Sequence, residues 1–250
     1  MTKLFRDENG LGRSVLVVAI IVVLAIAGVV TWSLTKNKPK TNPTNLAAAT
    51  SLAVASSETS ACITAYHDSE LCSYANNVDL FNHAFQSSGT ASNASGTASF
   101  EMKNDGNGNQ QISYTTASSQ LSLIKLNGDT YIQTSSGTTW LEYTPSDTNI
   151  PNIVPNPTSY FNMTISSTSA KDYNFSKVGT AACGGQSCME YSVLVVAKPS
   201  ITQHVFFDTS NHQLMEWEYS DASTGGSVNA TFTYGPVNIA KPSPVELATT

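Results

Sequence analysis

Arginine does not occur after Arg13 in this 250-residue chain, and Asp, Glu, Lys and Arg together make up only 12% of it. Residues 41–250 hold six Lys against sixteen Asp and Glu, a net charge of −10, whereas residues 1–40 hold six Lys or Arg against two acidic residues, a net of +4. Proteins bind phosphate backbones through Lys and Arg, so the acidic composition of residues 41–250 argues against nucleic acid as a partner.

The sequence also lacks the short motifs of common enzymes: it has no HExxH, no GxSxG, no P-loop and no dinucleotide fingerprint. Its four histidines lie singly in polar contexts and are expected at the surface or in turns: His67, His83, His204 and His212. Glu216 and Glu218 alternate with Trp217, and a solvated outer face of a sheet explains them better than a catalytic acid pair does. The chain is therefore predicted not to be an enzyme and to need no cofactor.

The first forty residues contain one long apolar run, the twenty uncharged residues from Val15 to Leu34. At about 1.5 Å per residue the run reaches roughly 30 Å, the apolar thickness of a bilayer, which predicts one transmembrane helix. A buried core helix would show a polar face, and none occurs before Thr31. A signal peptide is the other alternative, but cleavage after Ala25-Ile26-Ala27 would leave an apolar start, which favours an uncleaved anchor.

The charges on either side of the run are balanced, so they do not set its orientation. All four cysteines follow it, in a context rich in Ser, Thr, Asn and Gly that suits an oxidising exterior. We expect a single-pass protein of the cell membrane with a cytoplasmic N-terminus and an extracytoplasmic C-terminal domain. The predicted divisions are a cytoplasmic head (1–14), the transmembrane helix (15–34), a linker (35–45), the extracytoplasmic domain (46–242) and a tail (243–250).

The domain changes from helical to strand periodicity along its length. One or two helices are predicted before about residue 85, because five apolar residues are spaced by three and four: Leu71, Tyr74, Val78, Phe81 and Phe85. Beyond them the period is two, and strands are predicted up to Tyr143 and, after a proline-rich loop at 144–157, from Asp172 to Tyr234. The predicted fold class is α+β, an antiparallel sheet of eight or nine strands with a helix across one face.

Large apolar residues alternate with polar ones on these strands: Phe100, Met102, Tyr191, Val193, Val195, Phe207, Met215, Trp217, Tyr219, Phe232 and Tyr234. Buried aromatic residues are ordinary, so this pattern alone favours a filled core. The alternative is an apolar cavity between sheet and helix, as in small barrels that hold a ligand.

The four cysteines allow three disulfide connectivities, and closeness in sequence favours Cys62 with Cys72 and Cys183 with Cys188. A metal site made of two of these cysteines and two histidines is the weaker alternative: Cys62, His67, Cys72 and His83. Structural zinc pairs are usually spaced by two to four residues, and thiols oxidise outside the cell. We therefore expect two disulfides and no metal.

The C-terminal third contains a strand followed by Phe207-Asp208 and Leu214, and a last strand that runs from Phe232 into Gly235-Pro236-Val237-Asn238-Ile239 and Pro242. A short strand pair around Gly128-Asp129-Thr130-Tyr131-Ile132 and Trp140 accompanies them. These features resemble the bacterial LolA-like and LppX/LprG-like lipoprotein carriers over about half of the domain. The resemblance implies a curved half-barrel whose concave face, covered by one or two helices, holds acyl chains in an apolar cavity.

The resemblance thus implies a membrane-tethered lipid- or lipoprotein-binding module, although the family's carriers are soluble or lipidated rather than anchored by a helix. Met215, Trp217 and Tyr219 are expected to share the cavity face of one strand. The full set of expected cavity residues is Leu71, Val78, Phe81, Phe85, Phe100, Met102, Tyr191, Val193, Met215, Trp217, Tyr219 and Phe232. The alternative is a cell-surface interaction or signalling ectodomain without a small-molecule ligand, and a hydrolase is a third and weaker candidate.

Overall fold

The computed structural model describes residues 58–75, 80–134, 137–145 and 165–248. The predicted head, transmembrane helix and linker lie outside the described residues, as do Val78 and most of the proline-rich loop. Within the described ranges, no helix is both long enough and apolar enough to cross a membrane.

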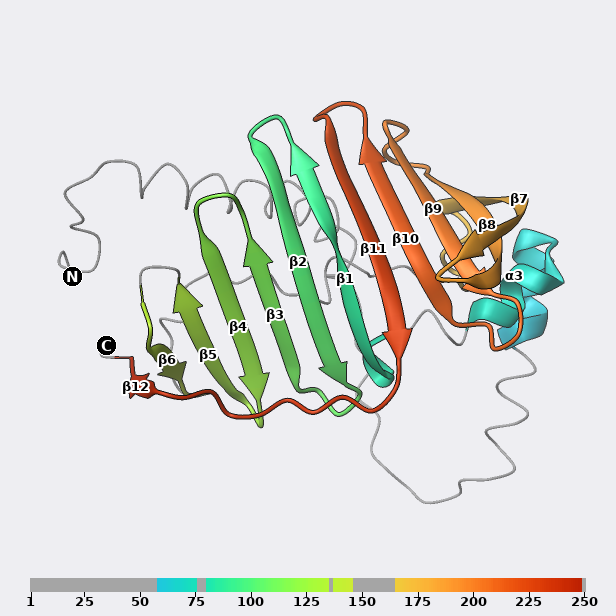
Figure 1. The fold of residues 1–250 in the computed structure, drawn as a ribbon. Helices are drawn as coiled ribbons and strands as arrows, with labels where there is room; N and C mark the ends of the chain where they lie inside the picture. The colour runs from blue at the N-terminus through green and yellow to red at the C-terminus, as the bar shows by residue number, and fades with distance from the viewer. Residues whose placement is uncertain (1–57, 76–79, 135–136, 146–164, 249–250) are drawn as a thin grey trace, which may run out of the picture.

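The domain is built on one open sheet of twelve strands (Figure 1). The strands are β1 Ala84–Asn93, β2 Gly96–Asp105, β3 Gln110–Thr115, β4 Gln120–Leu126, β5 Asp129–Thr134, β6 Trp140–Tyr143, β7 Tyr173–Cys183, β8 Gln186–Val195, β9 Ile201–Asp208, β10 Leu214–Asp221, β11 Gly226–Tyr234 and β12 Val245–Leu247. Their order across the sheet is β12-β6-β5-β4-β3-β2-β1-β11-β10-β9-β8-β7. All neighbours are antiparallel except β12 and β6.

Two meanders, β1 to β6 and β7 to β11, meet where β11 pairs with β1. The antiparallel sheet is confirmed, and it is wider than the predicted eight or nine strands. Residues 243–250, expected to form a tail, contribute β12, which extends the sheet beyond β6.

Short helical segments precede the sheet: residues 58–66, α3 (Ser69–Tyr74) and the 3₁₀ turn η2 (Leu80–Asn82). His67 has a positive φ of 55° and lies in the turn that follows the first segment. Asp68 then caps α3, because its side chain accepts a hydrogen bond from the backbone N–H of Leu71 at 2.9 Å. The turn and the new cap divide the described part of the predicted helical tract into separate short segments.

The prediction that Phe85 continues a helical stripe is wrong, because Phe85 lies in β1 and pairs with both Tyr234 and Asn104. Phe81, predicted in the same stripe, lies in η2. The alternate positions of β1 after Phe85 are filled by Ser, Gly and Ala, which give a weak period-two signal. Hydrogen bonding to strands on both sides, rather than local propensity, makes this segment a strand.

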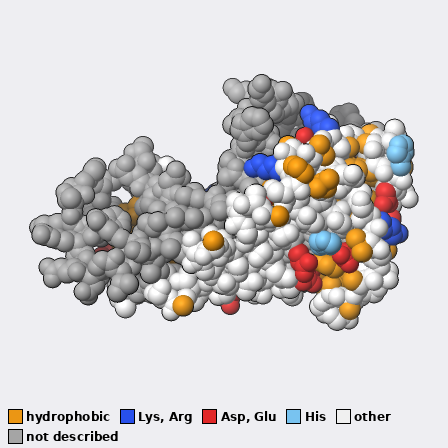
Figure 2. All heavy atoms as spheres, turned by 90° about the horizontal axis from the view of Figure 1, so that it is seen from above, with side chains coloured by type: hydrophobic (Ala, Val, Ile, Leu, Met, Phe, Trp, Pro, Cys, Tyr) orange, Lys and Arg blue, Asp and Glu red, His pale blue; other side chains and the backbone are white. Residues whose placement is uncertain are grey.

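The two faces of the sheet differ in chemistry. We call one side the core face, defined by buried residues that the register places together: Phe85, Phe100, Met102, Ile112, Leu123, Ile132, Tyr191, Val193, Val205, Phe207, Trp217, Tyr219, Ala230 and Phe232. The opposite, outer face carries polar residues such as Thr90, Asn229 and Glu218. From above, few charged side chains are visible on the described surface, and hydrophobic side chains gather towards its right-hand end (Figure 2).

The segment from Gly235 to β12 runs past the ends of β1 to β5 (Figure 1). Its Ile239 is buried in a second, smaller cluster with Ile124 and Tyr131 on the outer face. Lys241 forms an ion pair with Glu142 at 3.0 Å and lies 5.3 Å from the centre of the Tyr131 ring. The C-terminal segment therefore covers part of the outer face at the β4–β6 end.

Candidate functional site

α3 is fixed to the core face at the β7–β9 end of the sheet. Tyr74 stacks on Phe207 of β9 with ring centroids 4.5 Å apart and meets the edge of Tyr191 of β8. The Cys62–Cys72 disulfide joins α3 to the preceding helical segment. Packing and a covalent link thus act on the same short helix.

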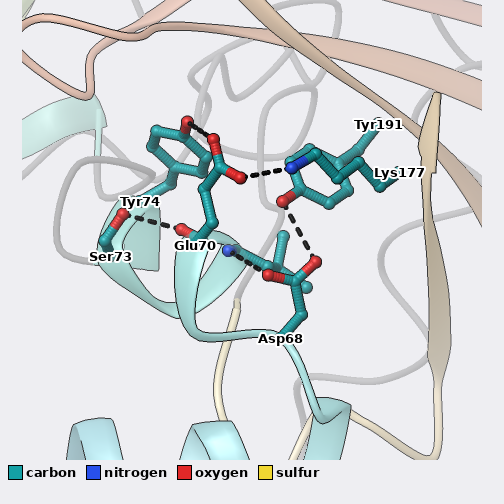
Figure 3. Close-up of polar contacts among 7 residues, drawn as sticks. Asp68, Glu70, Ser73, Tyr74, Lys177 and Tyr191 are labelled. Carbon is teal, nitrogen blue, oxygen red and sulfur yellow. Dashed lines mark hydrogen bonds and ion pairs between the residues drawn. The ribbon is translucent and has the colours of Figure 1, made fainter. Parts of the chain in front are cut away.

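A polar network surrounds this contact (Figure 3). The Tyr191 hydroxyl donates a hydrogen bond to Asp68 Oδ2 at 3.1 Å, and the Tyr74 hydroxyl donates one to Glu70 Oε1, also at 3.1 Å. Lys177 of β7 donates to Glu70 Oε2 at 2.5 Å. Each carboxylate therefore connects α3 to a strand or to an aromatic ring of the core.

The electrostatics of the network keep its phenols neutral. Burial, and then the nearby carboxylates of Glu70 and Asp68, raise the pKa of Tyr74 and of Tyr191 well above the usual range. The hydrogen bond to Glu70 raises the pKa of Lys177, which favours its charged form. Phenols with such pKa values act as hydrogen-bond donors and not as bases, so Tyr74 and Tyr191 hold α3 in position through the two carboxylates.

The core face continues well beyond α3. Buried apolar residues follow one another across adjacent strands, from Tyr191 in β8 through Trp217 in β10 and Phe232 in β11 to Ile132 in β5. The Trp217 indole donates to Gln203 Oε1 at 2.8 Å, which satisfies its N–H inside the core. Burial, assisted by Asp221, raises the pKa of Tyr219 to about 12.

Most of the predicted cavity residues lie together in one buried cluster. Its members from the predicted set are Leu71, Phe85, Phe100, Met102, Tyr191, Val193, Trp217, Tyr219 and Phe232, with Phe81 packed against them. Whether these residues line a cavity stays a prediction. Val78 lies outside the described residues.

Met215 requires a correction. A β-bulge shifts the register of β10 between Leu214 and Glu216, so Leu214 is the residue opposite Phe207 on the core face. Leu214 is buried, whereas Met215 is the extra residue of the bulge and is only half-buried. The predicted alternation of core-face and outer-face residues holds for Trp217 and Tyr219 and fails at Met215.

The core face also contains three buried polar residues that were not predicted from the sequence: Ser87, Asn104 and Gln203. Each is a polar residue in phase with apolar neighbours of its strand, a signal that is usable only once the strand itself is recognised. In β1 the positions after Phe85 are small or polar and show no apolar alternation, so Ser87 was not assigned to a face.

The outer face holds a second polar group. His204 Nδ1 lies 2.7 Å from Glu190 Oε1, and Asn229 donates to both Glu216 and Glu218 at 3.3 Å. Glu216 and Glu218 thus lie on the outer face, as predicted. The pairing of His204 with a carboxylate was not foreseen, because Glu190 belongs to a different strand.

The predicted disulfides, Cys62–Cys72 and Cys183–Cys188, are both present. Their thiols are consumed, so the alternative metal site from Cys62 and Cys72 is wrong. Across the described ranges, no group of three or more His, Cys, Asp or Glu side chains is arranged to hold a metal ion. Two disulfides are typical of a protein in an oxidising, extracytoplasmic compartment.

No protein-family model matches the sequence, and no curated protein matches it. Among solved structures, LprF from Mycobacterium bovis is 14% identical with a TM-score of 0.48, over 70% of this chain and 97% of LprF. MucB in complex with MucA(peri) is 13% identical with a TM-score of 0.41, over 70% of this chain and 57% of MucB. A LolA superfamily protein, NE2245 from Nitrosomonas europaea, is 10% identical with a TM-score of 0.27, over 67% of this chain and 94% of that one.

These matches confirm the predicted resemblance to LolA-like proteins as a similarity of structure. This chain spans little more than half of the length of MucB. With every TM-score below 0.5, the matches carry no argument about a ligand, a partner or an anchor.

Proposed function

We propose that this chain is a membrane-tethered, extracytoplasmic module that binds an acyl chain on the core face of its sheet. The observation that carries the proposal is the width of that face. α3 lies at the β7–β9 end of the sheet (Figure 1), where it contacts Lys177, Tyr191 and Phe207. Buried apolar residues continue across the sheet as far as Ile132 in β5.

The chemistry of the face favours a hydrocarbon ligand. Its centre is formed by uncharged side chains of β1, β2 and β11, among them Phe85, Met102 and Phe232. Burying a methylene group is worth about 0.8 kcal/mol, so a long acyl chain gains affinity from contact alone. A charged ligand would lose its hydration there without a partner.

The remaining parts of the proposal follow from the sequence. The run from Val15 to Leu34 would hold the domain at the membrane, residues 35–45 would form the linker, and the domain would extend to β12. A binding module of this kind needs no catalytic group, and the neutral phenols beside α3 suit a structural role.

The test uses tryptophan emission, because two of the three tryptophans lie on opposite faces. Trp217 is on the core face in β10, and Trp140 is on the outer face in β6 beside the C-terminal segment. Two full-length variants keep one of them each: Trp32→Phe with Trp140→Phe, and Trp32→Phe with Trp217→Phe. The methyl ester of doxyl-labelled stearic acid is uncharged, and its nitroxide quenches tryptophan at short range; it is titrated into each variant in amphipols.

We expect saturable quenching of Trp217 and no saturable quenching of Trp140. Equal quenching of the two would show insertion into the surrounding amphiphile rather than binding to the core face. No quenching of either would mean that the core face does not accept an acyl chain.

A second candidate, a protein-interaction module, is favoured by the edge strand β7. Val178 is 56% exposed at the bulge of this strand, and Val196, just after β8, is 54% exposed. An edge strand can accept an extended segment of a partner protein as a further strand. In this case a photo-crosslinker at Val178, but not one at Ser88 on the outer face of β1, would link to a single partner polypeptide in intact cells.

A further inference from the structure

Two buried oxygens of the described residues have no hydrogen-bond partner, Ser87 Oγ and Asn104 Oδ1. Ser87 is 4% exposed and Asn104 is fully buried. Native proteins pair nearly all buried polar atoms with protein groups or with ordered water, so an orphan pair requires an explanation.

The two oxygens belong to neighbouring positions on the core face. Ser87 of β1 lies opposite Met102 of β2, and Asn104 lies opposite Phe85, which makes Ser87 and Asn104 diagonal neighbours on adjacent strands. Residues in this relation have Cα atoms about 7–8 Å apart, within reach of one small group placed between their side chains. On its other side Ser87 lies opposite Phe232, so the pair is embedded in the apolar centre of the sheet.

The orientation of the Asn104 amide is fixed by its partners. Its Nδ2 donates to the backbone carbonyls of Phe81 at 3.2 Å and His83 at 2.6 Å. A reversed amide would place its oxygen against two carbonyl oxygens, which is unfavourable, so Oδ1 is the atom left to accept. The Ser87 hydroxyl can donate, so together the two side chains offer one donor and one acceptor.

We infer that Ser87 and Asn104 form a polar subsite for an acyl chain that carries an amide at its head. The amide carbonyl accepts from the Ser87 hydroxyl, and the amide N–H donates to Asn104 Oδ1, which satisfies both orphan atoms at once. An ester supplies the acceptor but no N–H, and a hydrocarbon supplies neither. The inference rests on the proposed function, since it places the head of the ligand on the same core face.

The experiment measures equilibrium binding of three radiolabelled probes to the full chain in amphipols. N-methylhexadecanamide and methyl hexadecanoate have nearly the same shape and differ in the N–H, and hexadecane lacks the carbonyl as well. The proteins are the wild type, Ser87→Ala, and Ser88→Ala as the matched control. Ser88 is the next residue of β1, on the outer face, with its Oγ 3.3 Å from Thr231 Oγ1.

We expect the wild type to bind the amide about fivefold more tightly than the ester, which is the usual size of one net hydrogen bond. Ser87→Ala should weaken binding of both carbonyl probes by a similar factor and leave hexadecane unchanged. Ser88→Ala should change none of the three affinities.

Two failures are distinguishable. Equal affinities for all probes, unchanged in Ser87→Ala, would show that the two oxygens hold water or remain unpaired; the subsite would be wrong and acyl-chain binding would stand. Absence of binding for all three probes would overturn the proposed function and the subsite together. If Ser87→Ala does not fold, the amide and ester probes on the wild type still decide, because only the amide brings the N–H that Asn104 would accept.

Discussion

The two ends of the sheet are covered by different elements and on opposite faces. At the β7–β9 end, α3 lies on the core face, held by Tyr74, by the Cys62–Cys72 disulfide and by carboxylates that accept from Tyr191 and Lys177. At the β4–β6 end, the C-terminal segment lies on the outer face around Ile239 and ends in β12.

This difference separates stabilisation of the sheet from contact with the core face. The C-terminal segment buries its own small cluster and does not approach the core face, so it can stabilise the sheet without affecting a ligand there. α3 shares Tyr191 and Phe207 with the large core cluster, so changes to it should affect both stability and binding.

The largest effect is expected at the helix end. Tyr74→Ala removes a buried ring that stacks on Phe207 and should lower the free energy of unfolding by about 3–5 kcal/mol. Urea unfolding followed by circular dichroism measures the change, with Tyr66→Ala, at a half-buried site, as the control. If both variants lost the same amount, α3 would not depend on its stacking contact with β9.

A smaller loss is expected at the other end. Ile239→Ala empties part of the outer-face cluster and should cost about 2–3 kcal/mol, near the lower limit for a buried aliphatic residue. Its affinity for acyl probes should equal that of the wild type, because Ile239 does not contact the core face. Reduced affinity in a folded Ile239→Ala protein would contradict the separation of sheet stabilisation from contact with the core face.

The smallest effect concerns acid. The hydrogen bond from Lys241, and then the one from the Tyr131 hydroxyl, lower the pKa of Glu142 from its ordinary 4.5. A carboxylate with a lowered folded pKa contributes stability above its unfolded pKa, and that contribution is lost as the pH falls through the folded value. Wild-type stability should therefore decrease more between pH 5 and about pH 3 than that of Glu142→Gln.

The melting temperature of each protein across this pH range gives the measurement. Glu101→Gln, on an exposed part of β2, serves as the matched control and should follow the wild type. If the melting temperatures of wild type and Glu142→Gln fell in parallel with pH, the ion pair with Lys241 would add nothing to the stability of the β4–β6 end.

Strands with strong alternation could be predicted from the sequence, and those without it could not. In β8, β10 and β11 large apolar residues recur at every second position, so Val193, Trp217 and Phe232 were assigned correctly to one face. β1 has Ser87, Gly89 and Ala91 at the corresponding positions, and its identity as a strand comes from its two neighbours in the sheet. β12, with three residues, carries too little pattern to be recognised.

The candidate site follows the same division. The apolar residues of the site can be predicted from their size and spacing in the sequence. The positions of its polar residues are set by contacts between distant parts of the chain, which the sequence pattern does not show. Lys177 reaches Glu70 across 107 positions of sequence, and Asn104 reaches His83 across 21. The bulge that displaces Met215 is likewise set by pairing with β9 and has no local signature.

The pairing of β1 with β11 has a consequence for how the domain is made. Ser88 and Thr231 are adjacent in the sheet and 143 residues apart in sequence, so the central contact of the fold has a very long loop to close. A chain exported from its N-terminus would assemble β1 to β6 first and leave β1 as an open edge until β11 emerges. The Ser- and Gly-rich sequence of β1 has a low tendency to aggregate, which protects this strand from pairing with other chains before β11 binds to it.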